Sequence, residues 1–211
     1  MAQLRLSLPF IILCLFCISG SVEPAFARQR PRAKAYIEAA CRTTRYPSLC
    51  FRCLSGFANS TIESPQQLAQ IALSVSLYKA LYTRSYVLKV AKELKVMKAD
   101  EYQTVNDCLQ QINDSVDQLS ESIKELRRLD QNPTIDDQFL WHISNVYTWV
   151  SAALTDASSC VDEFPGHRMS KMKATIKGKV LNVEQVTSNA LSLFHRYAAR
   201  YKSAARATKK P

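Results

Sequence analysis

Three cysteines fall within thirteen residues in the stretch CRTTRYPSLCFRC, which runs from Cys41 to Cys53. The Cys-x-x-Cys at its end is a spacing that serves thiol–disulfide exchange, zinc binding or structural disulfides. Redox catalysis needs this motif at a helix N-terminus beside a βαβ unit, and no strand pattern precedes it. A zinc site needs four closely spaced ligands, whereas His142, His167 and His195 lie far away in sequence. A structural role for these cysteines is therefore favoured.

The N-terminus indicates the compartment, which decides what thiol chemistry is available. The chain begins MAQLRLSLPFIILCLFCISG, with Arg5, an apolar run over 6–18 and then Ala25-Phe26-Ala27. These are the features of a secretory signal peptide with its cleavage site, so we expect residues 1–27 to be removed. The apolar run is shorter than the roughly 20 residues that span a bilayer, and no membrane anchor is expected. The mature protein is expected in the extracellular space, where disulfides persist.

The spacing of apolar residues predicts four long helices that position these cysteines. Apolar residues recur at steps of three and four, which places them on one side of each helix. The first helix is expected to start at Ser64-Pro65, an N-cap followed by a first-turn proline, and to bury Leu68, Ile71, Ala72, Val75, Tyr78 and Tyr82. The other three are expected to bury Val105, Leu109, Ile112, Val116, Leu119, Ile123 and Leu126; Ile143, Val146, Val150, Ala153, Ala157, Cys160 and Phe164; and Ile176, Val180, Val183, Thr187, Ala190, Phe194 and Tyr197.

The breaks between these helices decide the fold class. Pro133 and Pro165-Gly166 interrupt the periodicity, and the chain has only four glycines, which argues against a hairpin-rich β fold. The pattern predicts an all-α fold, an up-and-down four-helix bundle with a shorter helical appendage over 31–60. An extended coiled coil is the alternative, but only the helix beginning near Val105 has a regular heptad.

Five cysteines follow residue 27, which allows two disulfides and one free thiol. Antiparallel packing of two neighbouring helices could bring Cys108 and Cys160 together near one end. Closing a loop of about 50 residues in this way would contribute about 4 kcal/mol to stability. A bridge between Cys41 and Cys50 would pin the small appendage, which buries too little surface to hold its shape alone.

Three stretches together resemble the plant invertase and pectin methylesterase inhibitor family. CRTTRYPSLC is similar to its opening C-x-x-T-x-[YF]-P-x-x-C, and DCLQQINDSVDQL to its D-C-x-x-x-Y-x-D-A-V-x-x-L element. VYTWVSAALTDASSCVDEF is similar to V-x-T-W-x-S-A-A-L-T followed by a spaced cysteine, aspartate and phenylalanine. The three stretches occur in the family's order and spacing, and the resemblance covers about 33–200.

The resemblance implies a four-helix bundle with an N-terminal helical hairpin and disulfides between consecutive cysteines, Cys41 with Cys50 and Cys108 with Cys160. It leaves Cys53 as the free thiol, which we interpret as a buried apolar side chain. Ile112 stands where the family usually has tyrosine, and Ser115 where it has alanine. Both residues fit a helix, so these departures are expected to affect partner contacts more than the fold.

Two target enzymes compete within the family. Its invertase inhibitors usually carry Pro-Lys-Phe between the second and third bundle helices, where this chain reads LDQNPTIDDQF. The resemblance therefore favours an inhibitor of pectin methylesterase, which lies across the pectin cleft of the enzyme in a stoichiometric complex and performs no chemistry. An inhibitor of cell-wall or vacuolar invertase is one alternative, and a non-inhibitory extracellular binding module is another.

The residues expected to contact the partner are short polar groups on two helices. They are Asp107, Gln110, Gln111, Asp114, Thr148, Ser151 and Thr155. Such a face suits a hydrogen-bonded, partly hydrated interface, although the solvated side of any amphipathic helix has similar composition. Two sequons, at Asn59 and Asn113, are candidate glycosylation sites, and a glycan on Asn113 would argue against binding by this face.

The chain carries a net charge of +10, and its basic excess is greatest near the C-terminus. We divide the chain into a signal peptide over 1–27, the inhibitor-like domain over 28–200 and a basic tail over 201–211. The tail is either a solvated end or a means of retention on anionic cell-wall pectin in the apoplast. A nucleic-acid partner is disfavoured because no aromatic platform or finger spacing accompanies this charge.

The sequence contains none of the common catalytic motifs, including G-x-S-x-G, H-E-x-x-H and phosphate-binding glycine loops. Asp136-Asp137 is interpreted as helix-terminal charge rather than as an acid pair. We nominate no catalytic, metal-binding or cofactor-binding residue and expect a protein that is not an enzyme.

Overall fold

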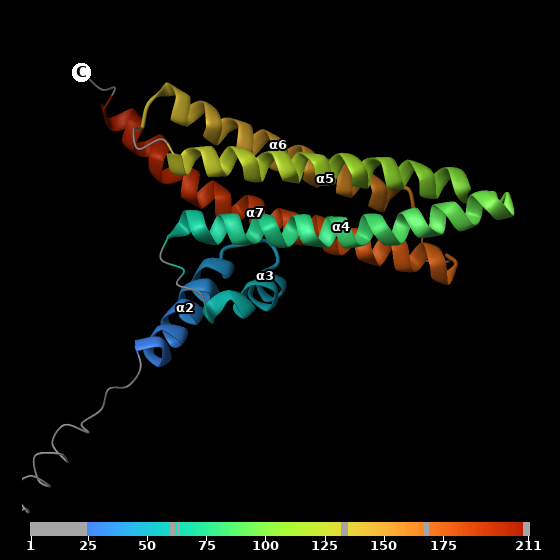
Figure 1. The fold of residues 1–211 in the computed structure, drawn as a ribbon, viewed down its shortest axis with the longest axis horizontal. Helices are drawn as coiled ribbons and strands as arrows, with labels where there is room; N and C mark the ends of the chain where they lie inside the picture. Colours follow the sequence, from blue (N-terminus) through green and yellow to red (C-terminus); the bar gives the residue numbers. More distant parts are fainter. Residues whose placement is uncertain (1–24, 60–61, 63, 132–134, 167–168, 209–211) are drawn as a thin grey trace, which may run out of the picture.

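Four long helices and a short helical hairpin make up the structure (Figure 1). The computed structural model describes residues 25–59, 62, 64–131, 135–166 and 169–208. The helices are α2 (Ala25–Cys41), α3 (Pro47–Leu54), the 3-10 helix η1 (Ser55–Asn59), α4 (Pro65–Met97), α5 (Tyr102–Gln131), α6 (Asp137–Asp162) and α7 (Lys171–Thr208). The described residues contain no β-strand, and the predicted all-α bundle with an N-terminal hairpin is confirmed.

Side chains at the helix ends explain where two of the helices begin. Ser64 caps α4: its Oγ accepts a hydrogen bond from the Gln67 N–H, and the Gln67 side chain accepts one from the Ser64 N–H. Pro65 occupies the first turn, where its missing N–H costs nothing. Asp136 caps α6 by accepting a hydrogen bond from the Phe139 N–H at 2.8 Å. This confirms that Asp136 acts at a helix terminus.

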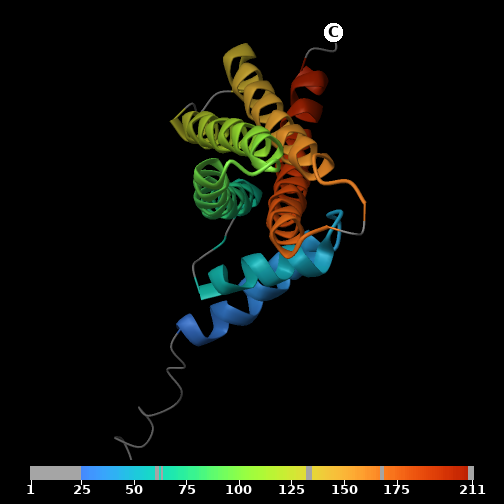
Figure 2. The ribbon, with the colours of Figure 1, turned by 90° about the vertical axis from the view of Figure 1, so that its right-hand side faces the viewer.

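The four long helices surround one apolar core. Both α4 and α6 pack against α5 and α7, and Figure 2 shows the bundle nearly end-on. Every residue of the three apolar series predicted between Val105 and Tyr197 is buried. The regular steps of three and four therefore identified the core side of α5, α6 and α7 correctly. No helix among the described residues is both long enough and apolar enough to serve as a membrane span.

The predicted core side of α4 is wrong in its second half. Tyr78 and Tyr82, which the spacing placed in the core, are 65% and 59% exposed. The helix instead buries small or weakly polar residues there, including Ser76, Ala80 and Thr83. The interior at this point is therefore lined by small side chains of α4, and the tyrosines lie on its outer side.

The structure contains both expected disulfides, and each joins two elements. Cys41–Cys50 ties the end of α2 to α3, and Cys108–Cys160 ties α5 to α6 across a sequence separation of 52. Cys53 forms no disulfide. Cys53 belongs to α3, which packs on the outside of the bundle, and it is half-buried rather than fully buried as expected.

The hairpin of α2, α3 and η1 lies against the side of the bundle formed by α4 and α7 (Figure 2). Asn189 of α7 accepts a hydrogen bond from the Tyr46 N–H at 2.9 Å and donates one to the Tyr46 carbonyl at 3.0 Å. Arg196 donates to the Ala40 carbonyl and to the Thr43 hydroxyl. Polar contacts from one helix thus hold the turn of the hairpin on the bundle.

Candidate protein-binding face

The antiparallel pair α5 and α6 is held together at two points. Cys108–Cys160 joins the helices near one end. Farther along, the Ser115 hydroxyl donates a hydrogen bond to the Ala153 carbonyl at 3.0 Å. Ser115 and Ile112, the two departures from the family pattern, are both fully buried. Neither side chain reaches the surface, so neither contacts a partner directly, and any effect on partner contacts would act through the packing of α5 against α6.

Four polar side chains form a row on the outer side of α5. Asp107, Gln111, Asp114 and Gln118 follow one another at steps of four, three and four, which places them on one side of the helix. Asp114 is exposed, while the other three are half-buried. Gln110, one residue from Gln111, is more exposed and lies at the edge of this row. We call the row, together with Asp156 of α6, the α5–α6 polar face.

This polar face contains buried acceptor atoms that lack a partner. Gln111 Oε1, Gln118 Oε1 and Asp156 Oδ2 are each inaccessible to solvent and make no hydrogen bond within the chain. A buried acceptor without a donor costs about 1–3 kcal/mol. The three side chains that carry these atoms are half-buried, so by turning outward they could accept hydrogen bonds from donors on a partner.

The pKa of the Asp156 carboxyl is affected by its position on this polar face. Burial raises the pKa of its carboxyl above the ordinary value, and the neighbouring Asp114 carboxylate raises it further. A hydrogen bond with Gln118 lowers the pKa and offsets part of this rise. A cation placed between Asp114 and Asp156 would relieve their repulsion.

The predicted contact residues on α6 lie on the side opposite its core residues. Thr148 and Thr155 are exposed and Ser151 is half-buried, at steps of three and four. The Thr148 hydroxyl donates to the Ser144 carbonyl at 3.0 Å, and the Thr155 hydroxyl donates to the Ser151 carbonyl at 3.1 Å. Their donor hydrogens are used within the helix, so these hydroxyls are left as acceptors. They therefore offer a partner the same chemistry as the polar face.

Two exposed tryptophans on α6 were not nominated from the sequence. Trp141 is 57% exposed and Trp149 is 38% exposed. Trp149 lies seven residues before Asp156, so both project from the same side of α6. Tryptophan is enriched among the residues that contribute most to binding. The sequence could have revealed them, because neither tryptophan occupies a position of the apolar series of α6 and both therefore lie outside the core.

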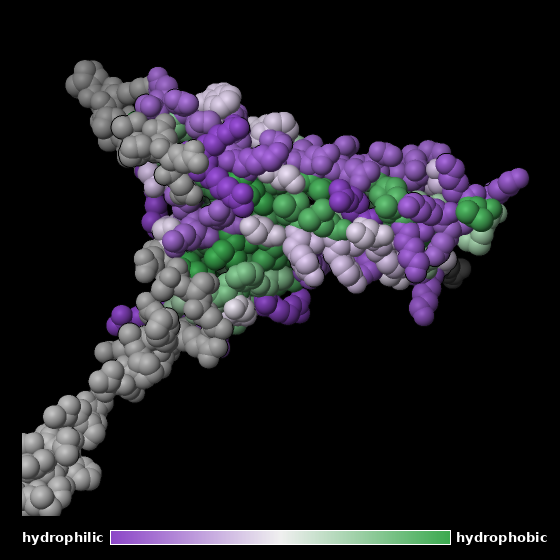
Figure 3. Space-filling model, in the orientation of Figure 1, coloured by the Kyte–Doolittle hydropathy of each residue, from purple (hydrophilic) through white to green (hydrophobic). Residues whose placement is uncertain are grey.

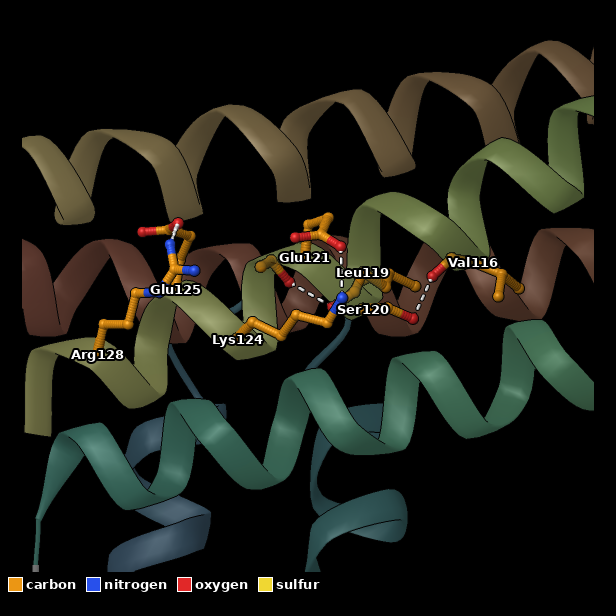
Figure 4. A network of polar contacts seen from close by, with 8 residues as sticks. Val116, Leu119, Ser120, Glu121, Lys124, Glu125 and Arg128 are labelled. Carbon is orange, nitrogen blue, oxygen red and sulfur yellow. Dashed lines mark hydrogen bonds and ion pairs between the residues drawn. The ribbon is translucent and has the colours of Figure 1, made fainter.

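A second buried polar contact also escaped the sequence analysis. Glu125 of α5 is buried, and its Oε2 lies 2.5 Å from His142 Nδ1 on α6. Arg128 donates to its other oxygen, and Figure 4 shows this pair beside the exposed Lys124–Glu121 pair on the same helix. Each oxygen of the Glu125 carboxylate therefore has a partner, and its contact with His142 links α5 to α6 beyond Ser115.

Charge is divided between the two halves of the bundle. The sequences of α5 and α6 contain nine acidic residues and three basic ones, whereas α4 and α7 contain two acidic and thirteen basic residues. Figure 3 shows hydrophilic residues along the upper edge of the bundle, over α5 and α6. The α5–α6 polar face therefore suits a partner with a positive potential.

The two sequons differ in their setting. Asn113 is half-buried within α5, and the Ser115 hydroxyl that completes its sequon is buried against α6. Asn59 ends η1, and the other two residues of its sequon lie outside the described residues. In the part of the chain that the structure describes, no group of three His, Cys, Asp or Glu side chains is placed to hold a metal ion.

Comparisons with known proteins agree with this architecture. The family model for plant invertase/pectin methylesterase inhibitors matches residues 35–193. Pectinesterase inhibitor 9 of Arabidopsis thaliana is 40% identical over 94% of this chain and 97% of its own length. Pectinesterase inhibitor 11 of the same plant is 37% identical over 91% of this chain and 95% of its own length.

A solved structure supports the fold independently. The crystal structure of mutant form A of a pectin methylesterase inhibitor from Arabidopsis superposes with a TM-score of 0.57 at 20% identity. The match covers 75% of this chain and 95% of that one. This chain therefore belongs to the plant invertase/pectin methylesterase inhibitor family.

Proposed function

We propose that this protein inhibits a plant pectin methylesterase by forming a one-to-one complex that blocks the pectin-binding cleft of the enzyme. The observation that carries the choice of target is the 40% identity to a pectinesterase inhibitor over nearly the full length of both chains. Inhibition of this kind needs a rigid surface and no catalytic group. Two disulfides and a continuous core supply such a surface.

The α5–α6 polar face is the proposed contact surface. It combines unsatisfied buried acceptors at Gln111, Gln118 and Asp156 with the exposed carboxylate of Asp114. Arginine and lysine carry several donors and no acceptor, so such side chains from the enzyme can pair directly with the Asp114 carboxylate. They can reach the other three acceptors once those half-buried side chains turn outward. The hydroxyls of Thr148 and Thr155 and the ring of Trp149 extend the surface across α6.

Secretion belongs to the same proposal. A signal peptide over 1–27 would deliver the protein to the apoplast, and two disulfides suit an oxidising compartment. Residues 1–24 lie outside the described residues, and α2 begins within the expected cleavage site. Glycosylation at Asn59 fits this route better than glycosylation at Asn113, whose sequon is packed against α6.

The basic tail over 201–211 is proposed to hold the protein on anionic pectin. The backbone of α7 continues into this segment as far as Thr208, and the sequence of the segment contains four basic residues and no acidic one. Truncation after Arg200 tests this role by the salt concentration that elutes the protein from a pectate column. Elution at an unchanged concentration would remove the tail from the proposal.

Parallel enzyme assays test the choice of target. The oxidised protein is titrated into a plant pectin methylesterase and, separately, into a cell-wall invertase at acidic pH. We expect the esterase to lose activity while invertase stays active. Inhibition of invertase alone would show that the absence of Pro-Lys-Phe does not exclude invertase as the target. Inhibition of neither enzyme by folded protein would favour a non-inhibitory binding module.

A further inference from the structure

Three tyrosines and one lysine form a second candidate binding site, on α4 and α7. Tyr78, Tyr82 and Tyr86 are four residues apart, so their rings follow one side of α4 at intervals of about 6 Å. Tyr78 and Tyr82 are exposed and Tyr86 is half-buried. Lys179 of α7 places its Nζ 4.7 Å from the ring centroid of Tyr82 and 4.9 Å from that of Tyr86. We call these four residues the tyrosine–lysine patch.

This patch continues the side of the bundle that the hairpin covers. Val75 of α4 and Val186 of α7 line a small pocket beneath Cys53 of α3. Tyr82 lies seven residues after Val75, and Lys179 lies seven residues before Val186. Seven residues are two helical turns, and α4 and α7 run antiparallel, so both steps lead away from the hairpin (Figure 1). The patch is therefore the uncovered continuation of this surface.

The surroundings of the patch are strongly positive. Close to the patch, α4 carries Lys79, Arg84 and Lys89, and α7 carries Lys173 and Lys177. Glu93 lies 4.0 Å from Lys89 in an ion pair, and Glu184 is five residues from Lys179 and projects from a different side of α7. An anion approaching the tyrosines thus enters a region of attractive potential.

We propose that the tyrosine–lysine patch binds a polysaccharide chain that carries carboxylates. Exposed aromatic rings offer flat apolar faces on which the C–H faces of sugar rings can stack, and the Lys179 ammonium pairs with a carboxylate. A neutral glycan gains nothing from the positive potential, and a simple polyanion gains nothing from the rings. A chain of uronic acids uses both features. Single-stranded nucleic acid also combines stacking with negative charge and therefore enters the test as a competitor.

The test measures binding of the full oxidised protein to polygalacturonate, with dextran as the neutral control and no esterase present. Tyr82→Ala and Lys179→Gln are each expected to weaken binding about tenfold, because they remove a stacking ring or the central charge. Tyr82→Phe keeps the ring, and Lys92→Gln removes an exposed charge elsewhere on α4. Both controls are expected to bind within about twofold of the parent protein, and unchanged thermal melts would show that each variant is folded.

Three results would overturn this site. Unchanged affinity of Tyr82→Ala and Lys179→Gln would show that the patch takes no part in binding. Loss of binding on truncation after Arg200, with both patch variants unaffected, would assign binding to the tail. Displacement of polygalacturonate by single-stranded DNA at equal or lower concentration would assign the patch to a nucleic acid. Because the patch and the α5–α6 polar face lie on different helices, patch variants should inhibit esterase normally, and the two proposals fail independently.

Discussion

The Ser115 hydroxyl on α5 donates a hydrogen bond to the Ala153 carbonyl on α6 across 3.0 Å, inside the core of the bundle. The family pattern that this stretch resembles has alanine at this position, so Ser115 places a buried hydroxyl where that pattern has a methyl group. It is accommodated because a carbonyl of the neighbouring helix lies within reach. The contact fixes the register of the two helices that carry the α5–α6 polar face.

Replacing Ser115 by alanine should therefore cost only a little stability. Ser115→Ala removes one buried hydrogen bond and leaves no buried donor behind, so we expect a loss of about 1 kcal/mol in the free energy of unfolding. Urea denaturation followed by circular dichroism measures this change. Ser144→Ala removes an exposed hydroxyl with a bond inside its own helix and should change stability by less than about 0.5 kcal/mol. A loss of several kcal/mol in Ser115→Ala would contradict this account.

Sequence periodicity predicted the core where apolar residues repeat and failed where small residues replace them. The series in α5, α6 and α7 is made of aliphatic or aromatic residues at almost every step, and all of its members are buried. In α4 the buried side carries Ser76, Ala80 and Thr83. The apolar spacing therefore placed the larger tyrosines in the core instead of these residues. Which side of α4 faces the core depends on how it packs against α5 and α7, and the residue spacing within α4 alone does not determine this.

Contacts between helices were the least predictable features. Glu125 and His142 are 17 residues apart on different helices, and neither residue belongs to a recognisable motif. The polar residues expected to bind a partner were found by their helical spacing alone. Which of them carry unsatisfied acceptors depends on the packing of α5 against α6, so Gln118 and Asp156 were missed.

Asn189 is expected to control the attachment of the hairpin. Asn189→Leu removes both hydrogen bonds to Tyr46 and leaves its backbone groups without partners, so we expect a loss of about 2 kcal/mol. Hydrogen exchange should become faster over 33–58 while the amides of α5 and α6 keep their protection. Asn182→Leu on the same helix is the matched control and should leave exchange unchanged. Equal protection of the hairpin in both variants would refute the role of Asn189.

Asp156 should make stability depend on pH. Its pKa is raised in the folded state, so the folded protein binds this proton more tightly than the unfolded chain. The resulting contribution to stability is complete below the ordinary carboxyl pKa and is lost as the pH rises through the raised value. Asp156→Asn should remove this component and flatten the profile of unfolding free energy above about pH 4. A profile identical to that of the parent protein would show that Asp156 is not the group responsible.

Positive charges introduced on the α5–α6 polar face and on the adjoining surface of α6 should weaken inhibition of the esterase. Asp114→Arg places a cation among the acceptors proposed to receive basic side chains, and Thr148→Arg adds bulk and charge on α6. We expect each to raise the dissociation constant of the complex at least tenfold, measured by inhibition at several enzyme concentrations. Ser85→Arg on α4 introduces the same side chain at an exposed serine away from this face and should inhibit normally. Equal potency of all three variants would exclude this face.

Occupation of the pectin cleft of a methylesterase, in a stoichiometric complex, is the proposed basis of inhibition. Its most direct test is a titration of the oxidised protein into a fixed, known concentration of esterase at several pectin concentrations. We expect activity to fall linearly to zero with a break at one inhibitor per enzyme, and we expect more pectin to weaken the inhibition. Residual activity at saturation, or inhibition that pectin does not affect, would contradict occupation of the cleft.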